Sequence, residues 1–99
     1  MLHIVNKSPF ENSTLESCLR VATKGAALLL IEDGVYAATK GTAAAQKLKQ
    51  AMPGVSVFVL WPDLEARGVQ DSVLEGIKCV DYGGFVDLVA EHASVQSWL

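Results

Sequence analysis

Four short segments rich in hydrophobic residues stand out along the chain, and each is ended by polar or turn-forming residues. They are Leu2 to Val5, Ala26 to Ile31, Val55 to Leu60 and a shorter segment, Ile77 to Val80, which contains Lys78. Short, mainly apolar runs are typical of strands that are buried on both faces of a sheet. We therefore predict four strands in this order.

The segments between these runs have helical features. Ser13-Thr14-Leu15-Glu16 has the form of a capping box, so a helix is expected from about Thr14 to Ala22. Thr42 is a candidate cap for a second helix. The further helical segments are Val35 to Lys40, Ala43 to Met52, Pro62 to about Arg67, and a last helix through Phe85 and Leu88 that ends near Glu91 or His92. The tail from Ser94 to Leu99 is assigned to no element, and its last residues, Gln96 to Leu99, could pack on this domain or on a partner.

Strands that alternate with helices imply right-handed crossovers between parallel strands. The expected fold class is therefore α/β, with a single small domain over residues 1–99. It consists of an open, mostly parallel sheet with helices on both faces. Ligands bind such sheets beyond the carboxyl ends of the strands. The turns to examine are Asn6 to Phe10, Glu32 to Val35, Trp61 to Asp63 and Asp81 to Gly84.

Composition adds an expectation about partners. Hydrophobic residues make up 51% of the 99 residues and charged residues only 19%, with a mean hydropathy of +0.29. A domain of this size buries only about two-thirds of the surface of its unfolded chain, so part of the apolar surplus is expected to face other subunits. The net charge of -3 gives no basic surface for a phosphate backbone, and direct nucleic-acid binding is not expected.

Targeting and membrane signals are weak in this sequence. The longest continuous apolar run, Ala26 to Ile31, is far shorter than the roughly 20 residues of a bilayer-spanning helix. The chain also enters its first strand without the features of a signal peptide. We expect a cytoplasmic protein that does not bind membranes.

Most motifs that would carry chemistry are lacking. Gly83-Gly84 has the spacing of neither a dinucleotide fingerprint nor a phosphate loop, and no serine has glycines two residues before and after it. Asp33 and Asp81 fit the preference of turns for aspartate, and His3 and His92 are expected to be structural. The sequence thus predicts no cofactor and no metal.

Two cysteines remain, Cys18 and Cys79. They are too few for a disulfide framework and lack the spacing of a zinc site. Cys79 lies in a predicted strand, where a free cysteine is usually a small buried hydrophobic residue, so it is expected to be inert.

Cys18 leaves two interpretations open. With Leu15, Leu19 and Ala22 it has the spacing of one apolar helix face, which favours a packed thiol. It also follows the expected helix start by about five residues and has Arg20 and Lys24 close in sequence, and both features favour a thiolate. Cys18 is therefore the one candidate catalytic residue.

A family resemblance rests on six segments, which are Leu2 to Phe10, Leu15-Glu16-Ser17-Cys18-Leu19, Ile31 to Ala38, Pro62 to Gly68, Val80 to Leu88, and Val95-Gln96-Ser97-Trp98-Leu99. Through them the sequence resembles the DsrH/TusB family over nearly the whole chain. The resemblance, strongest to DsrH, implies a small subunit of a heterohexameric sulfur relay complex with DsrE and DsrF, or TusD and TusC, as sister subunits. All these subunits share one α/β fold.

The resemblance also implies a role in passing persulfide sulfur to a carrier, DsrC in sulfur oxidation or TusE in thiolation of the tRNA wobble uridine. In DsrE and TusD the sulfur-bearing cysteine ends the third strand, upstream of a motif similar to Arg67-Gly68. Here that position is Leu60, which cannot carry sulfur. The chain is thus not expected to be the principal sulfurtransferase subunit.

Cys18 is found in DsrH and is absent from many TusB chains. This favours the sulfur-oxidation version, with a mainly assembling role and Cys18 as a secondary persulfide site. The alternatives are a TusB-type subunit with a purely structural role in tRNA thiolation, and a free-standing ligand-binding domain.

Overall fold

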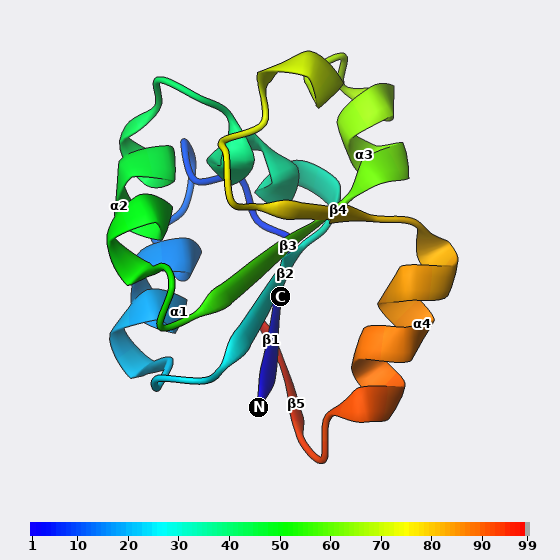
Figure 1. Cartoon of the computed structure of the whole chain (residues 1–99). Helices are drawn as coiled ribbons and strands as arrows, with labels where there is room; N and C mark the ends of the chain where they lie inside the picture. The colour runs from blue at the N-terminus through cyan, green and yellow to red at the C-terminus, as the bar shows by residue number, and fades with distance from the viewer. Residues whose placement is uncertain (99) are drawn as a thin grey trace.

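The computed structural model describes residues 1–98, and Leu99 lies outside the described residues. Residues 1–98 form a five-stranded sheet with four α-helices and two short 3-10 helices (Figure 1). The strands are β1 (Leu2–Val5), β2 (Ala27–Leu30), β3 (Ser56–Leu60), β4 (Lys78–Val80) and β5 (Val95–Trp98). The helices are α1 (Thr14–Val21), η1 (Glu32–Ala38), α2 (Ala43–Ala51), α3 (Trp61–Ala66), η2 (Gln70–Ser72) and α4 (Tyr82–Glu91).

The strand order is β4-β3-β2-β1-β5, and every neighbouring pair is parallel. The four strands predicted from apolar runs are confirmed. The sequence pattern missed β5, because this strand lies at the sheet edge and three of its four residues are exposed. An edge strand needs no continuous apolar run, so hydropathy alone does not reveal it.

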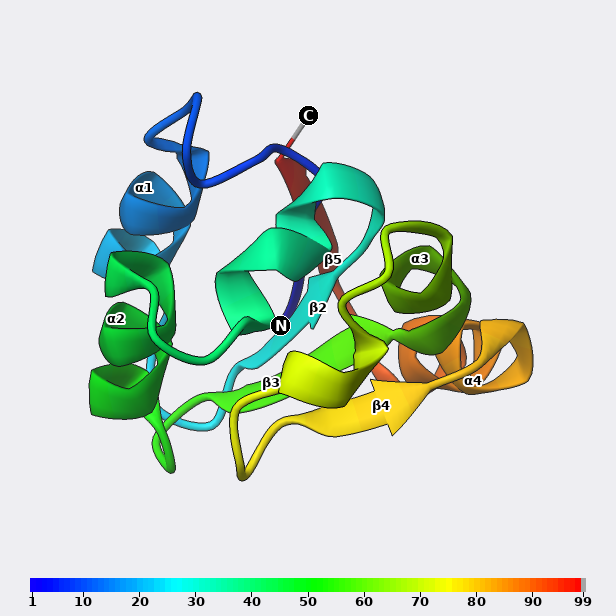
Figure 2. The same ribbon diagram turned by 90° about the horizontal axis from the view of Figure 1, so that it is seen from above.

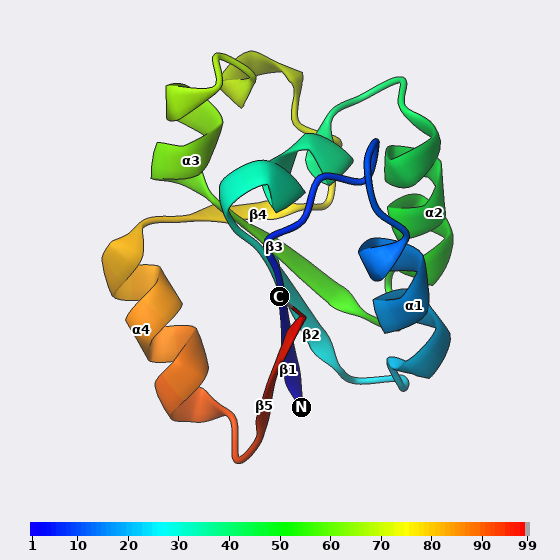
Figure 3. The same ribbon diagram turned by 180° about the vertical axis from the view of Figure 1, so that it is seen from behind.

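Helices lie on both faces of the sheet, which confirms the predicted fold class. Helices α1 and α2 lie side by side on one face together with η1, whereas α4 alone covers the other face (Figures 2 and 3). Helix α3 follows β3 directly and contributes Leu64 to the core on the α1 and α2 side. None of the helices in residues 1–98 is long and apolar enough to cross a membrane.

The sheet separates two cores of unequal size. The larger one joins alternate strand residues such as Leu28, Leu30 and Val57 to buried side chains of α1 and α2. The smaller one contains five buried residues, Leu2, Ile4, Ala27, Leu29 and Leu88. Leu88 is the buried residue that α4 contributes.

Helix capping differs from the prediction at α1. Ser13 makes no side-chain cap bond, because its backbone angles, φ -94° and ψ 16°, are not the extended ones that an N-cap requires. Thr42 and Asp81 do have extended angles. Thr42 Oγ1 accepts from Ala45 N at 3.1 Å, which confirms the predicted cap of α2. Asp81 Oδ1 accepts from Gly84 N at 2.8 Å and caps α4.

Candidate functional site

Polar side chains from three turns meet beyond the carboxyl ends of β1, β2 and β3, as expected for parallel strands. Asn6 follows β1, and its Nδ2 donates to Glu32 Oε2 at 3.3 Å. The Glu32 N–H donates in turn to Asp63 Oδ2 at 2.6 Å, which joins the turn after β2 to helix α3. Residues remote in sequence thus form one connected network, which we call the carboxyl-edge network.

Arg67 closes this network. Its Nε donates to Asp33 Oδ1 at 3.0 Å, and its second terminal nitrogen lies 2.9 Å from the same oxygen. The remaining terminal nitrogen donates to the Asp63 carbonyl at 3.2 Å. The guanidinium is therefore held by two partners of this chain, and it neutralises the carboxylate that it contacts.

The backbone at this edge is tightly constrained. Glu32 has a φ of 50°, in the left-handed region that residues other than glycine seldom adopt. Two residues later a Cβ on Gly34 would overlap the Val5 carbonyl oxygen. The Asp63 carboxylate and the Asn6 amide hold Glu32 in this conformation from both sides.

The end of β3 carries no reactive group. Leu60, where the resemblance places the sulfur-bearing cysteine of the sister subunit, is the last residue of β3 and is 3% exposed. Helix α3 begins at the next residue, Trp61, and Asp63 lies in its first turn. The carboxyl-edge network offers hydrogen bonds and an ion pair at this position but no nucleophile.

Cys18 lies on the inner side of α1 and is fully buried in the larger core. Burial disfavours the charged thiolate and raises the pKa of Cys18 to about 11. The structure thus shows the packed thiol that the helical spacing predicts, with the same face burying Leu15. Whether Cys18 also receives sulfur stays a prediction.

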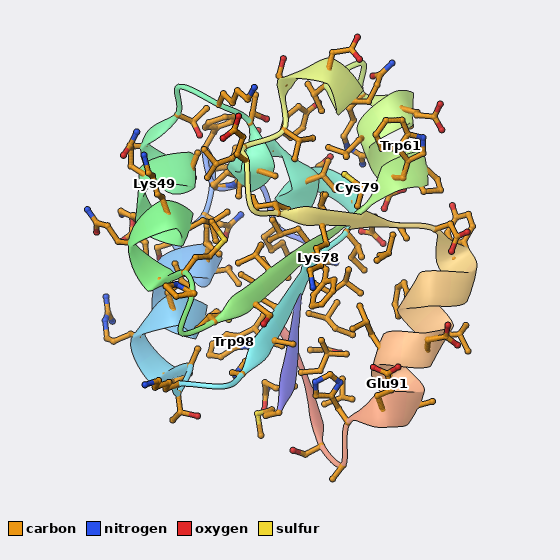
Figure 4. The ribbon with its side chains drawn as sticks, viewed as in Figure 1. Lys49, Trp61, Lys78, Cys79, Glu91 and Trp98 are labelled. Atoms are coloured by element: carbon orange, nitrogen blue, oxygen red, sulfur yellow. The ribbon has the colours of Figure 1, made fainter. Side chains whose placement is uncertain are left out.

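Cys79 was expected to be buried, and this expectation is wrong. It is exposed on β4, the strand nearest the viewer in Figure 4. The reason is the place of β4 in the sheet, because an edge strand has a neighbour on one side only. Partial burial still raises the pKa of Cys79 above its ordinary value.

The two histidines have structural contacts. His3 is 4% exposed, and its Nδ1 accepts a hydrogen bond from Trp98 Nε1 at 3.1 Å, which ties β5 to β1. Desolvation lowers the pKa of His3. His92 Nδ1 lies 2.7 Å from the Leu88 carbonyl at the end of α4. Within residues 1–98, no three His, Cys, Asp or Glu side chains are grouped so that they could hold a metal ion.

An apolar stripe lies on the outside of α4, and the sequence analysis missed it. Tyr82 is 62% exposed, Val86 66% and Val89 38%. Their spacing of four and three residues places them on one side of the helix, next to the side that buries Leu88. We call these three residues the α4 stripe. The sequence-based prediction of this helix rested on Phe85 and Leu88 and did not consider its outer side.

Comparison with protein-family models finds a match that covers most of the chain. The family described as "DsrH like protein" matches residues 7–95. Among curated relatives, the protein TusB of Pectobacterium parmentieri is 37% identical over 98 residues, which cover 99% of this chain and 100% of the relative. The protein TusB of Shigella flexneri is also 37% identical with the same coverage. That of Escherichia coli K12 is 36% identical, again with the same coverage.

Solved structures share the fold at lower identity. The ychN protein from E. coli superposes with a TM-score of 0.85 at 19% identity and covers 97% of each chain. The protein MTH1491 from Methanobacterium thermoautotrophicum has a TM-score of 0.73 at 19% identity, covering 97% of this chain and 95% of its own. These likenesses support the assignment of the fold.

Proposed function

The chain belongs to the DsrH-like family, and from this premise we propose that it is a TusB-type subunit of a cytoplasmic sulfur relay complex. In this proposal the complex passes persulfide sulfur to a TusE-type carrier for thiolation of the tRNA wobble uridine. The names of the curated relatives favour this version over sulfur oxidation, which the presence of Cys18 had favoured. The sister subunits are TusC-type and TusD-type proteins.

The observation that carries the proposal is the buried Leu60 at the carboxyl end of β3. Sulfur relay needs an accessible thiolate, because the thiolate is the nucleophile that accepts sulfane sulfur. The carboxyl end of β3 supplies a leucine, and at this edge Glu32 is bonded to Asp63 and Arg67 to Asp33. The principal transfer step therefore belongs to a sister subunit, and this chain contributes to assembly.

The α4 stripe supports an assembling role. Three apolar side chains are exposed on the outer side of one helix, whereas its inner side buries Leu88 in the smaller core. Helix α4 contains Asp87 and Glu91 but no lysine or arginine. The stripe therefore fits a sister-subunit surface that is apolar at its centre and basic at its rim.

Cys18 remains a candidate secondary sulfur site in this proposal. Its burial and raised pKa add a condition, because sulfur can reach it only if α1 moves away from the sheet. The transfer would move one sulfane sulfur from a donor persulfide to the Cys18 thiolate and release the donor thiolate.

The test uses the co-expressed complex with wild-type chain, with Cys18→Ser and with Cys79→Ser. We expect both variants to pass sulfur to the carrier at the wild-type rate. Intact-mass spectrometry should find the gain of about 32 Da per sulfur atom on a sister subunit. A loss of transfer in Cys18→Ser, with that mass gain on the wild-type chain, would make this chain a sulfur carrier and contradict the assembling role.

A further inference from the structure

The two edge strands of the sheet differ in how well they are protected from pairing with another strand. Strand β4 has three residues, and its exposed Lys78 lies over the Phe58 ring at 5.8 Å. Short edges and lysines are the usual means by which proteins prevent edge-to-edge association. At the other edge, residues 93–98 include no charged residue and no proline.

The backbone groups that β5 leaves free can be identified from its pairing with β1. Leu2 N donates to the Ser94 carbonyl at 3.0 Å. In a parallel ladder alternate residues turn to opposite neighbours, so Gln96 and Trp98 also bond to β1. The N–H and C=O groups of Val95 and Ser97 then point away from the sheet. Among the described residues, only the Gln96 side-chain amide approaches one of them, at 3.5 Å from the Ser97 carbonyl.

The free backbone groups of β5 are complementary to those of a second copy of β5. If a second copy of β5 ran antiparallel with Gln96 on the two-fold axis, Val95 would lie opposite Ser97 of the second copy. Each such pair exchanges two hydrogen bonds, and the two-fold axis creates two pairs. Four hydrogen bonds would form without any change in the β1–β5 ladder.

Apolar side chains surround this edge. Val95 is 41% exposed, Met1 52% and Val21 56%. A groove of about 440 Å³ lies beside β5 on the face that carries His3, and Met1, Val21, Gln96 and Trp98 line it. Figure 4 shows Trp98 on the α1 side of the sheet. Gln96 pairs with His3 in the β1–β5 ladder and therefore lies on this face. In the antiparallel pair, the Gln96 side chains of the two copies would lie next to each other at the groove.

Charge distinguishes this edge from the α4 stripe as a place for self-association. Two copies of α4 would bring Asp87 and Glu91 close to their own equivalents with no basic residue of the helix between them. Two copies of β5 bring together only uncharged residues. We propose that the β5 edge is a self-association surface, on which a second copy of this chain adds its own β5 to form one continuous sheet. This inference does not depend on the sulfur relay role.

The experiment measures association of the purified full chain by sedimentation equilibrium. Four hydrogen bonds and a small apolar contact predict a weak dimer, with a dissociation constant of roughly 10 to 100 µM. Gln96→Lys and Gln96→Glu each place like charges on the two-fold axis, so each alone should weaken the dimer by about tenfold or more. Mixed in equal amounts, the two variants should form a one-to-one dimer at least as tight as the wild type.

Amide hydrogen exchange locates the contact. The Val95 and Ser97 amides should gain protection as the concentration rises. A wild-type chain that stays monomeric up to about 0.5 mM would overturn the proposal. It would also fail if the mixed variants did not associate, or if these amides became protected only when sister subunits were added, since the edge would then accept a foreign strand.

Discussion

The carboxyl-edge network and the α4 stripe both lie at the surface, but they use their side chains in opposite ways. In the network, Arg67, Asp33 and Asp63 bond to groups of the same chain. On the stripe, Tyr82 and Val86 are exposed. A surface whose polar groups are already paired contributes to the stability of its own fold. A surface of exposed apolar groups gains free energy only when a partner covers it. Substitutions in the carboxyl-edge network should therefore lower the stability of the isolated chain, whereas substitutions on the α4 stripe should weaken binding to a partner.

The largest effect is expected at Gly34. A Cβ at this position overlaps the Val5 carbonyl oxygen, and backbone cannot move aside as a side chain can. Gly34→Ala should lower the free energy of unfolding by about 3 kcal/mol in urea titrations of the isolated chain. Gly41→Ala is the control, because it has open space and a φ of +83°, and it should cost only about 1 kcal/mol. Equal losses would show that the close approach at Gly34 is unimportant.

Ionisation of Cys18 should give the next largest effect. The thiol has a pKa of about 11 in the folded chain against an ordinary value of 9.0, so the folded state binds the proton more tightly. The resulting stabilisation is complete below pH 9 and is lost as the pH rises to about 11. It amounts to at most about 3 kcal/mol.

The measurement is urea unfolding between pH 8 and pH 11 for the wild type and for Cys18→Ala. The variant corrects for lysines and tyrosines that ionise in the same range. If the difference in free energy of unfolding between the two chains did not change with pH, the Cys18 thiol would be accessible and α1 would open readily.

Arg67→Ala should have a moderate effect on stability. It removes the bonds to Asp33 and to the Asp63 carbonyl, and the side chain is 22% exposed. We expect a loss of about 1 kcal/mol, reduced by high salt. Arg20→Ala, at an exposed position on α1, should change the stability far less. An Arg67→Ala variant as stable as the wild type would mean that the network is not needed to hold the backbone at the carboxyl edge of the sheet.

The smallest effect on the isolated chain is expected on the α4 stripe. Val86 is exposed, so Val86→Lys should change the free energy of unfolding by no more than about 0.5 kcal/mol. The check is the same urea titration. A large loss would show that Val86 packs within its own chain, and the contrast between the two regions would disappear.

Much of the sheet could be predicted from the sequence because its central strands are buried on both faces. The runs that became β1, β2 and β3 are mainly apolar for that reason, and that of β2 is entirely so. Strand order is not a local property, so the sequence could not show that β4 and β5 lie at the edges. This one gap explains both the missed β5 and the wrong expectation for Cys79.

The candidate site was predictable only in part. The topology rule located the turns that meet at the carboxyl edge, and the resemblance drew attention to Leu60. The bond from Glu32 to Asp63 joins residues 31 positions apart, and no spacing in the sequence signals it. Ser13 shows the opposite case, because a good capping motif makes no cap bond when the backbone is not extended there.

The most direct test of the assembling role is native mass spectrometry of the complex co-expressed with its sister subunits. Val86→Lys should leave the chain folded but weaken its binding to the complex by about 100-fold or more, and sulfur transfer to the carrier should fall with it. Gln46→Lys, which adds the same charge at an exposed position on α2, should leave the complex intact. A Val86→Lys complex that kept its full composition and its transfer rate would contradict the account.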